Sequence, residues 1–247
     1  MCGRYTLAVR VNSLVPLFEL QGAPPEPEQA GMALPRYNIA PTQPVLIVRQ
    51  GKDGRRRGSW AKWGLIPPGA RDAKGAAKRI NARAETVFEQ PAFRDAARHR
   101  RCLVPTDGFF EWRKIGERKQ PYHVRAPDGG VWAMAGIWST WTDEEGAPVD
   151  TCSVLTTSPN ETLSGLHDRM PVLVPPEQYE LWLDPEEVIP AHLASLLVSA
   201  PEEALVMVPV AETVNRVKNQ GPECLEQISE EEAEREPEPP RQFGFGF

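Results

Sequence analysis

The sequence contains no run of 18 apolar residues, no signal peptide with an apolar core and no lipidation motif. A transmembrane helix needs about 20 consecutive apolar residues, so the sequence predicts no membrane partner. We therefore expect a soluble protein of the cytoplasm. A hydrophobic content of 40% with seven tryptophans predicts a globular chain rather than one that is disordered throughout.

Cysteine and histidine are scarce, at four residues each. The cysteines form no C-x-x-C pair and the histidines lack the spacing of zinc fingers, so we predict no metal site and no cofactor. In a reducing compartment, Cys102 and Cys152, each beside an apolar run, are expected to be buried strand thiols.

The sequence also lacks internal repeats, β-α-β alternation and a glycine loop that would cradle a phosphate. It shows instead a succession of strand patterns separated by Gly, Pro and charged turns. We predict an α+β protein whose single domain, residues 1–225, is an antiparallel sheet curled into a barrel and flanked by helices. The expected strands are 2–7, 44–48, 58–65, 102–112, 120–126, 131–141, 150–157 and 204–210, and the expected helices are 12–20, 85–99, 177–183 and 190–197.

Charge is unevenly distributed along the chain, which carries −6 in total. Residues 226–247 hold seven acids against Arg235 and Arg241, so we predict a disordered acidic tail. The tail ends in Gln-Phe-Gly-Phe-Gly-Phe. These phenylalanines could dock in a groove of a partner such as a replication-fork protein, dock on the protein's own surface, or be low-complexity filler.

A basic stretch lies in the first half of the chain. Residues 49–101 contain 15 Lys and Arg against 5 Asp and Glu. Such a stretch is either a solvated surface or a binding surface for a polyanion, because phosphate contacts by Lys and Arg supply much of nucleic-acid affinity.

Cys2 is the most informative single residue. If Met1 is removed, Cys2 carries an α-amine and a thiol on adjacent carbons, with unperturbed pKa values of about 8 and about 8.5. An aldehyde can form an imine with this nitrogen, after which the sulfur closes a thiazolidine ring. The alternative is a small, inert, half-buried cysteine.

Three further positions suit acid-base chemistry or anion binding. Glu111 stands between large aromatic residues, where partial desolvation raises a carboxyl pKa toward the range useful for proton transfer, unless its charge reaches water. His167 shares one face of an extended segment with Arg169, which suits a proton relay beside an anion, although a lone histidine is more often structural. Asn81 and Arg83 share one side of the entry to a predicted helix.

Seven segments, taken in order, resemble the SRAP family (SOS response-associated peptidase, or abasic site processing protein). The resemblance spans roughly residues 2–224. The segments are Met-Cys-Gly-Arg-Tyr at the start, Tyr-Asn-Ile-Ala-Pro-Thr at 37–42, Trp-Gly-Leu-Ile-Pro at 63–67, Asn-Ala-Arg-Ala-Glu-Thr at 81–86, Gly-Phe-Phe-Glu-Trp at 108–112, Ala-Gly-Ile-Trp at 135–138 and His-Asp-Arg-Met-Pro at 167–171.

This resemblance implies covalent capture of abasic sites in single-stranded DNA by a monomeric, nucleoid-associated protein. By similarity, Cys2 forms a thiazolidine with the ring-opened deoxyribose aldehyde after Met1 is removed. Asn81 would hold the sugar or the Cys2 amine, Glu111 would move protons, and His167 would assist at the sugar-phosphate. The residues implied in DNA binding are Arg4, Arg83 and Arg169 at phosphates, with Trp63, Asn38 and Pro41 lining the cleft.

Two other functions remain open from the residues. Cys2 with Glu111 and His167 could form an N-terminal-nucleophile peptidase that removes Met1, and the basic stretch could serve a non-catalytic single-strand binder. The chain departs from the family pattern in Phe110, where tyrosine is frequent, in the 22–35 loop and in the acidic tail.

Overall fold

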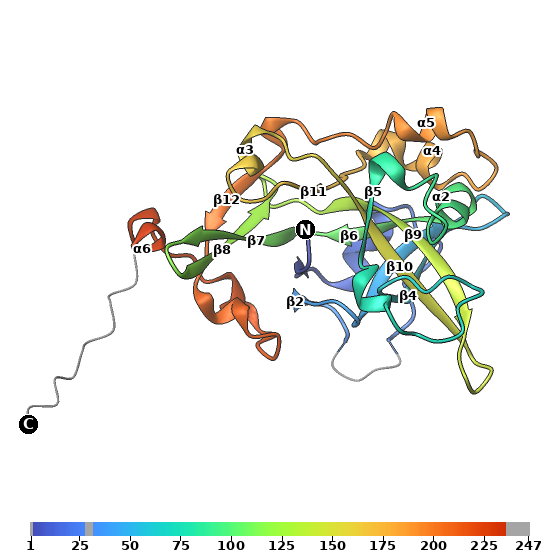
Figure 1. Cartoon of the computed structure of the whole chain (residues 1–247), viewed down its shortest axis with the longest axis horizontal. Helices are drawn as coiled ribbons and strands as arrows, with labels where there is room; N and C mark the ends of the chain where they lie inside the picture. The colour runs from blue at the N-terminus through green and yellow to red at the C-terminus, as the bar shows by residue number, and fades with distance from the viewer. Residues whose placement is uncertain (1, 28–31, 236–247) are drawn as a thin grey trace, which may run out of the picture.

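Two β-sheets make up most of the protein (Figure 1), in a computed structural model that describes residues 2–27 and 32–235. The first is an antiparallel sheet of five strands in the order β12-β8-β7-β1-β2. These strands are β1 (Tyr5–Leu7), β2 (Arg36–Ile39), β7 (Gly108–Ile115), β8 (Arg118–Arg125) and β12 (Val206–Pro209).

The second sheet closes on itself. Its path runs β11-β10-β4-β3-β6-β9, and a further pairing of β9 with β10 closes a five-stranded barrel. The β10–β4 and β10–β5 pairings are parallel and the others are antiparallel. The strands are β3 (Pro44–Gln50), β4 (Arg56–Trp63), β5 (Asn81–Arg83), β6 (Arg101–Thr106), β9 (Trp132–Thr142), β10 (Pro148–Thr157) and β11 (Met170–Pro171). The predicted α+β class and curled sheet are confirmed.

One predicted strand, 102–112, is two strands in the structure. β6 belongs to the barrel and β7 to the other sheet, and Asp107 makes the corner between them. Its carboxylate accepts hydrogen bonds from the Thr6 hydroxyl at 2.5 Å and from the Ala8 backbone N–H at 2.6 Å. The next residue, Gly108, lies so close to His123 that an added Cβ would stand 2.1 Å from the imidazole Nε2. The corner therefore depends on the carboxylate of Asp107 and on a glycine at position 108, where no side chain fits.

Replacing Gly108 with alanine is expected to lower the free energy of unfolding by about 1–3 kcal/mol, the usual cost of overpacking a filled core. Urea unfolding measures the loss. Gly69→Ala is the matched control, because an added Cβ at Gly69 meets no atom within 4 Å. Equal stability of the two variants would contradict the close packing at the corner.

Helices are short and lie outside the sheets. The helix predicted at 85–99, with Pro91 starting its second part, is confirmed only for Arg94–His99, which form α2, whereas residues Ala84–Thr86 form a 3-10 turn. Pro91 explains the break, since it lacks an N–H and disfavours helical backbone before it. The α-helices are α1 (Leu14–Leu17), α2 (Arg94–His99), α3 (Glu161–Ser164), α4 (Tyr179–Leu183), α5 (Pro190–Ala194) and α6 (Glu230–Glu234). The remaining 3-10 segments are Val11–Ser13, Ala76–Lys78, Pro176–Gln178, Glu202–Ala204, Glu212–Asn215 and Pro222–Leu225.

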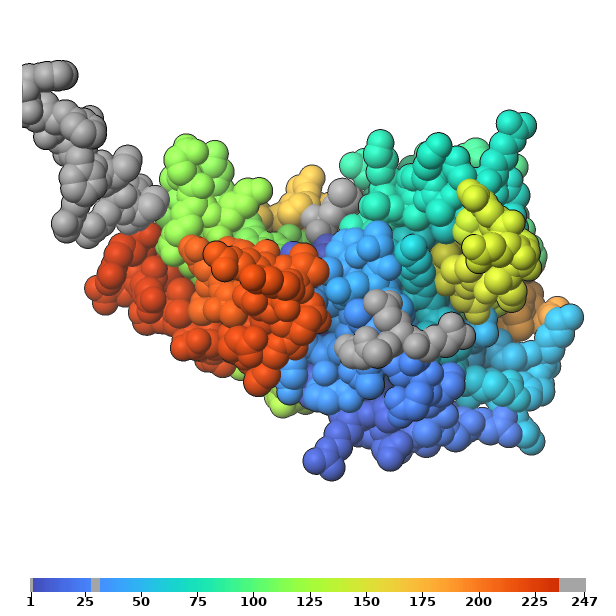
Figure 2. Space-filling view, turned by 90° about the horizontal axis from the view of Figure 1, so that it is seen from below, coloured from blue at the N-terminus to red at the C-terminus, as the bar shows by residue number. Residues whose placement is uncertain are grey.

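The predicted start of a disordered tail at residue 226 differs from the structure, in which the chain stays ordered through Arg235. Gln227 bridges to Val210, and Ser229 caps α6 by accepting a hydrogen bond from the Glu232 N–H. Ala233 is fully buried. The acidic composition of residues 226–235 gave no indication of these contacts. The predicted disorder of 236–247 lies outside the described residues. Figure 2 shows this C-terminal segment, in orange and red, beside the green β7–β8 hairpin.

The main apolar core fills the barrel and extends under the five-stranded sheet. It includes Cys102 and Cys152, which are fully buried free thiols as predicted. A smaller cluster forms where Phe110 packs against Val210, Val214 and Cys224. No helix in the described part of the chain is long and apolar enough to span a membrane.

Candidate active site

Cys2 and Asn81 lie together although 79 residues separate them. Asn81 opens β5, which the parallel pairing with β10 holds in place, and its Nδ2 donates a 2.8 Å hydrogen bond to the Cys2 carbonyl oxygen. Its Oδ1 is buried and has no hydrogen-bond partner. Because a buried acceptor without a partner is costly, Asn81 is poised to accept a hydrogen bond from a group beside Cys2.

A cleft of about 470 Å³ is lined by Glu111, whose charge acts on the nearby Cys2 thiol. Its lining comes from the start of the chain, the β7–β8 hairpin, the loop before β11 and the 3-10 turn 212–215. We call it the Glu111 cleft; its lining residues are Arg4, Glu111, Trp112, Lys114, Lys119, His167 and Asn215. The structure thus brings four predicted site residues, Cys2, Asn81, Glu111 and His167, into one neighbourhood.

Glu111 has the environment of a proton-transfer group. Only 4% of the residue is exposed, and this burial raises its pKa to about 7, with a further contribution from the negative charge of Asp168. A carboxyl group with such a pKa exchanges protons readily near neutral pH.

The raised pKa of Glu111 also predicts a pH dependence of stability. The pKa of this carboxyl is 4.5 in the unfolded chain and about 7 in the folded protein. Its contribution to the free energy of unfolding is therefore fully present below pH 4.5 and is lost as the pH rises through about 7. Glu111→Gln should therefore gain roughly 2–3 kcal/mol relative to the wild type between pH 5 and pH 8. Urea unfolding at both pH values tests this, and parallel behaviour of the two proteins would contradict it.

The Cys2 thiol is held in its neutral form. Complete burial raises its pKa, and the nearby charge of Glu111 raises it further. A neutral thiol is a weak nucleophile compared with a thiolate. The sulfur is therefore suited to a second step on an activated carbon rather than to the first attack.

His167 has two neighbours at the same ring nitrogen. The Arg169 backbone N–H donates to Nδ1 at 3.0 Å, and an Asp168 carboxylate oxygen lies 2.7 Å from that atom. Burial lowers the pKa of His167. A neutral ring accepts from the Arg169 N–H and carries its proton on Nε2, whereas a protonated ring donates from Nδ1 to Asp168. His167 is thus able to hold or release one proton.

Arg4 is held in the cleft by Asn38 and the C-terminal part of the domain. Its Nη1 donates to Asn38 Oδ1 at 2.7 Å and to the Val214 carbonyl at 3.0 Å. The Asn38 amide donates to the Arg216 and Asn219 carbonyls at 3.2 and 2.8 Å. Asn38 is fully buried, so its placement differs from the expected lining of a DNA cleft. In the structure it positions Arg4.

Arg169 forms an ion pair rather than an open anion site. Its two terminal nitrogens lie 2.7 and 2.8 Å from the two carboxylate oxygens of Glu85, and Nη2 also donates to the Thr156 carbonyl. The hydrogen bonds from Arg169 lower the pKa of Glu85. Arg83, the last residue of β5, is exposed. Of these two predicted phosphate ligands, Arg83 is therefore the one open to solvent.

Trp63 is also placed differently from its expected role. Its ring is fully buried, packs edge-on against Tyr5 with centroids 5.3 Å apart, and donates from Nε1 to the Ile80 carbonyl at 2.8 Å. No face of this indole is open to a base, so Trp63 supports the sheet behind Cys2. Pro41 is half-buried in the turn after β2.

Four lining residues of the cleft were not predicted from the sequence: Trp112, Lys114, Lys119 and Asn215. Lys114 and Lys119 lie directly opposite each other across β7 and β8, an arrangement of like charges that destabilises a strand pair. Both are exposed and face the cleft mouth. A bound anion would offset their repulsion. Alternation along β7 could have identified Trp112 and Lys114 as partners on one face.

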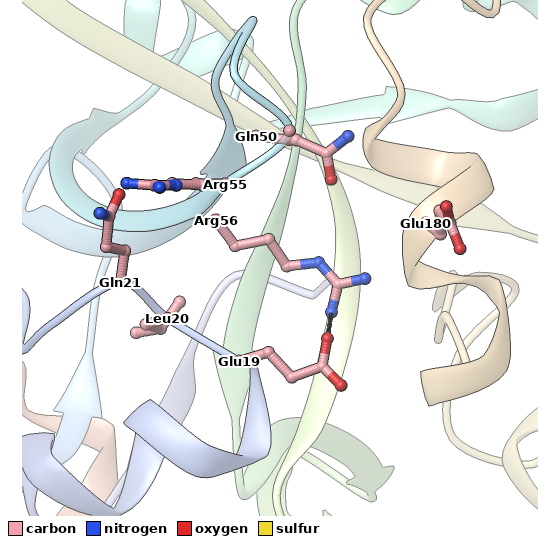
Figure 3. A pocket seen from close by; sticks show the side chains of 8 residues that line it. Glu19, Leu20, Gln21, Gln50, Arg55, Arg56 and Glu180 are labelled. Atoms are coloured by element: carbon pink, nitrogen blue, oxygen red, sulfur yellow. Dashed lines mark hydrogen bonds and ion pairs between the residues drawn. The ribbon is translucent and has the colours of Figure 1, made fainter.

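Another polar cavity, of about 670 Å³, lies between α4 and the β3–β4 turn (Figure 3). Within it, Arg56 forms a 2.9 Å ion pair with Glu19, and Gln50 and Glu180 stand nearby. None of the predicted site residues lines this cavity. Across residues 2–27 and 32–235, no group of three or more His, Cys, Asp and Glu side chains could hold a metal ion.

Comparison with known proteins places the chain in a family. A profile described as SOS response associated peptidase (SRAP) matches residues 1–217. The chain belongs to the SRAP family. This confirms the resemblance seen in the sequence, and the SRAP match covers the residues of the Glu111 cleft.

Similar SRAP proteins include "Abasic site processing protein YoqW" of Bacillus subtilis (strain 168), 38% identical over 92% of this chain and 99% of that protein. "Abasic site processing protein YedK" of Escherichia coli (strain K12) is 32% identical over 92% and 100% of the two chains. "Abasic site processing protein HMCES" of Gallus gallus is 31% identical over 91% and 77%. A solved structure from Bacteroides thetaiotaomicron superposes with a TM-score of 0.83, at 27% identity, over 92% of this chain and 100% of that one.

Proposed function

We propose that this SRAP protein processes abasic sites in single-stranded DNA by linking them covalently to Cys2. The observation that carries the proposal is the hydrogen bond between Asn81 and Cys2, close to a cleft whose lining includes the buried Glu111 together with His167. Relatives named abasic site processing proteins align over nearly the whole chain and support the same function.

The chemistry begins with ring opening. An abasic sugar is mostly a closed hemiacetal, so its ring oxygen must gain a proton and its anomeric hydroxyl must lose one to the carboxylate or to water before the aldehyde is exposed. Glu111, with a pKa of about 7, is the proposed proton donor. With Met1 removed, the Cys2 amine then adds to the aldehyde carbon, and loss of one water gives an imine. The free Oδ1 of Asn81 would accept a hydrogen bond from the amine or the sugar hydroxyl.

The sulfur completes the linkage. The neutral Cys2 thiol adds across the C=N bond, its proton passes to the nitrogen, and a thiazolidine forms. An imine beside the 3′ phosphate would otherwise lead to β-elimination and strand scission, so closure of the ring protects the strand. His167 is proposed to exchange a proton at the sugar-phosphate.

The strand itself would be bound by cations and one aromatic side chain. Arg4 and Arg83 are proposed phosphate ligands, and the like-charged pair Lys114 and Lys119 extends the positive surface at the mouth of the cleft. Trp112, partly exposed in the cleft, offers the stacking surface that the buried Trp63 lacks. Base stacking on an aromatic side chain contributes about 1–3 kcal/mol.

The experiment is direct. Protein whose intact mass shows loss of Met1 is mixed with single-stranded DNA carrying one abasic site and run on a denaturing gel. We expect one shifted band whose mass equals protein plus DNA minus one water. Binding only in native gels would instead support a simple single-strand binder, and cleavage of added peptides would support a peptidase.

A further inference from the structure

Glu85 and Arg169 form an ion pair that connects two segments of the candidate active site. The terminal nitrogens Nη1 and Nη2 of Arg169 donate to Oε1 and Oε2 of Glu85 at 2.7 and 2.8 Å. Nη2 also donates to the Thr156 carbonyl of β10. The Arg169 side chain is only 12% exposed. Because a bidentate pair between arginine and a carboxylate fixes orientation as well as distance, the Arg169 side chain is held in one place.

Each partner of this pair belongs to a segment that carries a proposed catalytic side chain. Glu85 follows β5 by two residues, and β5 begins with Asn81, whose amide donates to the Cys2 carbonyl. Arg169 lies directly before β11 and two residues after His167. The ion pair therefore ties the segment of His167 to the segment that contacts Cys2.

The backbone of Arg169 influences where the His167 ring carries its proton. The Arg169 N–H donates to Nδ1 of the ring at 3.0 Å, which requires that this nitrogen carry no proton. An Asp168 carboxylate oxygen lies 2.7 Å from the same nitrogen and favours a proton on it instead. The neutral ring has two tautomers, and the choice between them depends on which of these partners bonds to Nδ1.

The ion pair favours the backbone partner. The Asp168 side chain is 82% exposed, so water competes for its carboxylate. The Arg169 N–H belongs instead to a residue whose side chain is anchored on Glu85 and Thr156. When this N–H bonds to Nδ1, the ring proton is on Nε2. Because His167 lines the Glu111 cleft, the protonated Nε2 can then donate to an oxygen of a bound sugar-phosphate.

We propose that Glu85 is a positioning residue for covalent capture, which acts through Arg169 to keep His167 in the tautomer with its proton on Nε2. Glu85 itself is not among the lining residues of the Glu111 cleft. The inference rests on the proposed function, in which His167 exchanges a proton at the sugar-phosphate. Without the Glu85 carboxylate, the Arg169 side chain loses its bidentate anchor and its backbone N–H shifts. Asp168 then accepts from Nδ1, and Nε2 is left without the proton.

Nitrogen NMR of the histidine rings tests the tautomer in the protein without DNA. At about pH 8, where neutral histidine predominates, we expect Nδ1 of wild-type His167 to carry no proton. In Glu85→Ala, part of the population should carry the proton on Nδ1. The His167→Gln variant identifies the signals. The matched control is Glu89→Ala, because Glu89 is also exposed and lies four residues further along the chain. An unchanged tautomer in Glu85→Ala would overturn the proposal, whether or not the wild type captures DNA.

Capture rates test the consequence for the chemistry. We expect Glu85→Ala to slow cross-linking to abasic single-stranded DNA by roughly 10–100-fold, because a misplaced group can cost about 10²-fold. Glu85→Gln has the same length and keeps one acceptor for Arg169, so it should regain part of the rate, and Glu89→Ala should keep all of it. In an Arg169→Ala background, Glu85→Ala should cause no further loss, since its effect passes through the arginine.

Three results of these rate measurements would overturn the role of Glu85. An unchanged rate in Glu85→Ala would mean that the ion pair does not act on the reaction. A faster rate would mean that Glu85 only masks Arg169 as a phosphate ligand. Losses that add in the double variant would mean that Glu85 acts by a route other than Arg169. Absence of capture by the wild type would instead contradict the proposed function, and the NMR measurement would still decide the role of Glu85.

Discussion

Replacing Cys2 with alanine is expected to abolish the denaturation-resistant complex with abasic single-stranded DNA. The alanine variant keeps an α-amine but has no sulfur, so any imine remains open to hydrolysis and to β-elimination. The measurement is the fraction of DNA shifted on a denaturing gel after a fixed incubation. The expected fraction is indistinguishable from that of a sample without protein.

Two variants separate the role of the sulfur from a general effect on folding. Cys102→Ala removes another fully buried thiol and should leave capture intact. Cys2→Ser retains the amine, so a hydride reductant should trap its imine while strand scission increases relative to the wild type. Undiminished capture by Cys2→Ala would show that a different nucleophile forms the bond.

Replacing Glu111 with glutamine should slow capture by roughly 10²–10⁴-fold, the usual contribution of a positioned proton donor. Burial raises the pKa of Glu111 to about 7, so its protonated fraction falls as the pH rises through that value. The capture rate of the wild type is accordingly expected to fall in part as the pH rises above 7. The rate of the glutamine variant should not show this decrease. Single-turnover rates between pH 5.5 and pH 9 measure both effects.

Glu117→Gln is the matched control for this measurement. Glu117 lies in the exposed turn of the same β7–β8 hairpin, outside the Glu111 cleft. Its variant should retain the wild-type rate and the wild-type pH profile. A Glu111→Gln variant that captures DNA at the wild-type rate would remove this carboxyl from the mechanism.

Local alternation was sufficient to predict much of the barrel. The hairpin of β3 and β4 follows directly from apolar strands on either side of the Gly-Lys-Asp-Gly turn at 51–54, and the buried setting of Glu111 follows from its aromatic neighbours. Both depend on residues close together in the sequence. For the same reason, contacts between residues far apart in the chain could not be predicted from local patterns.

The misplaced residues show this limit. Trp63 and Trp112 both stand in strands, but Trp63 is fully buried at the end of β4 and Trp112 is partly exposed in β7, which leaves the barrel at the Asp107 corner. Asn38 reads as a loop residue before a proline, yet its amide bonds to carbonyls about 180 residues later. Tertiary pairing of this kind decides burial, and no local pattern reports it.

The hydrogen bond from Arg4 Nη1 to the Val214 carbonyl joins the two ends of the domain at the cleft itself. During synthesis the amino terminus emerges first, and the carbonyls that hold Arg4 and Asn38 are added about 210 residues later. The contacts that hold Arg4 and Asn38 in place are therefore completed only after translation has passed Asn219, so the cleft is assembled last.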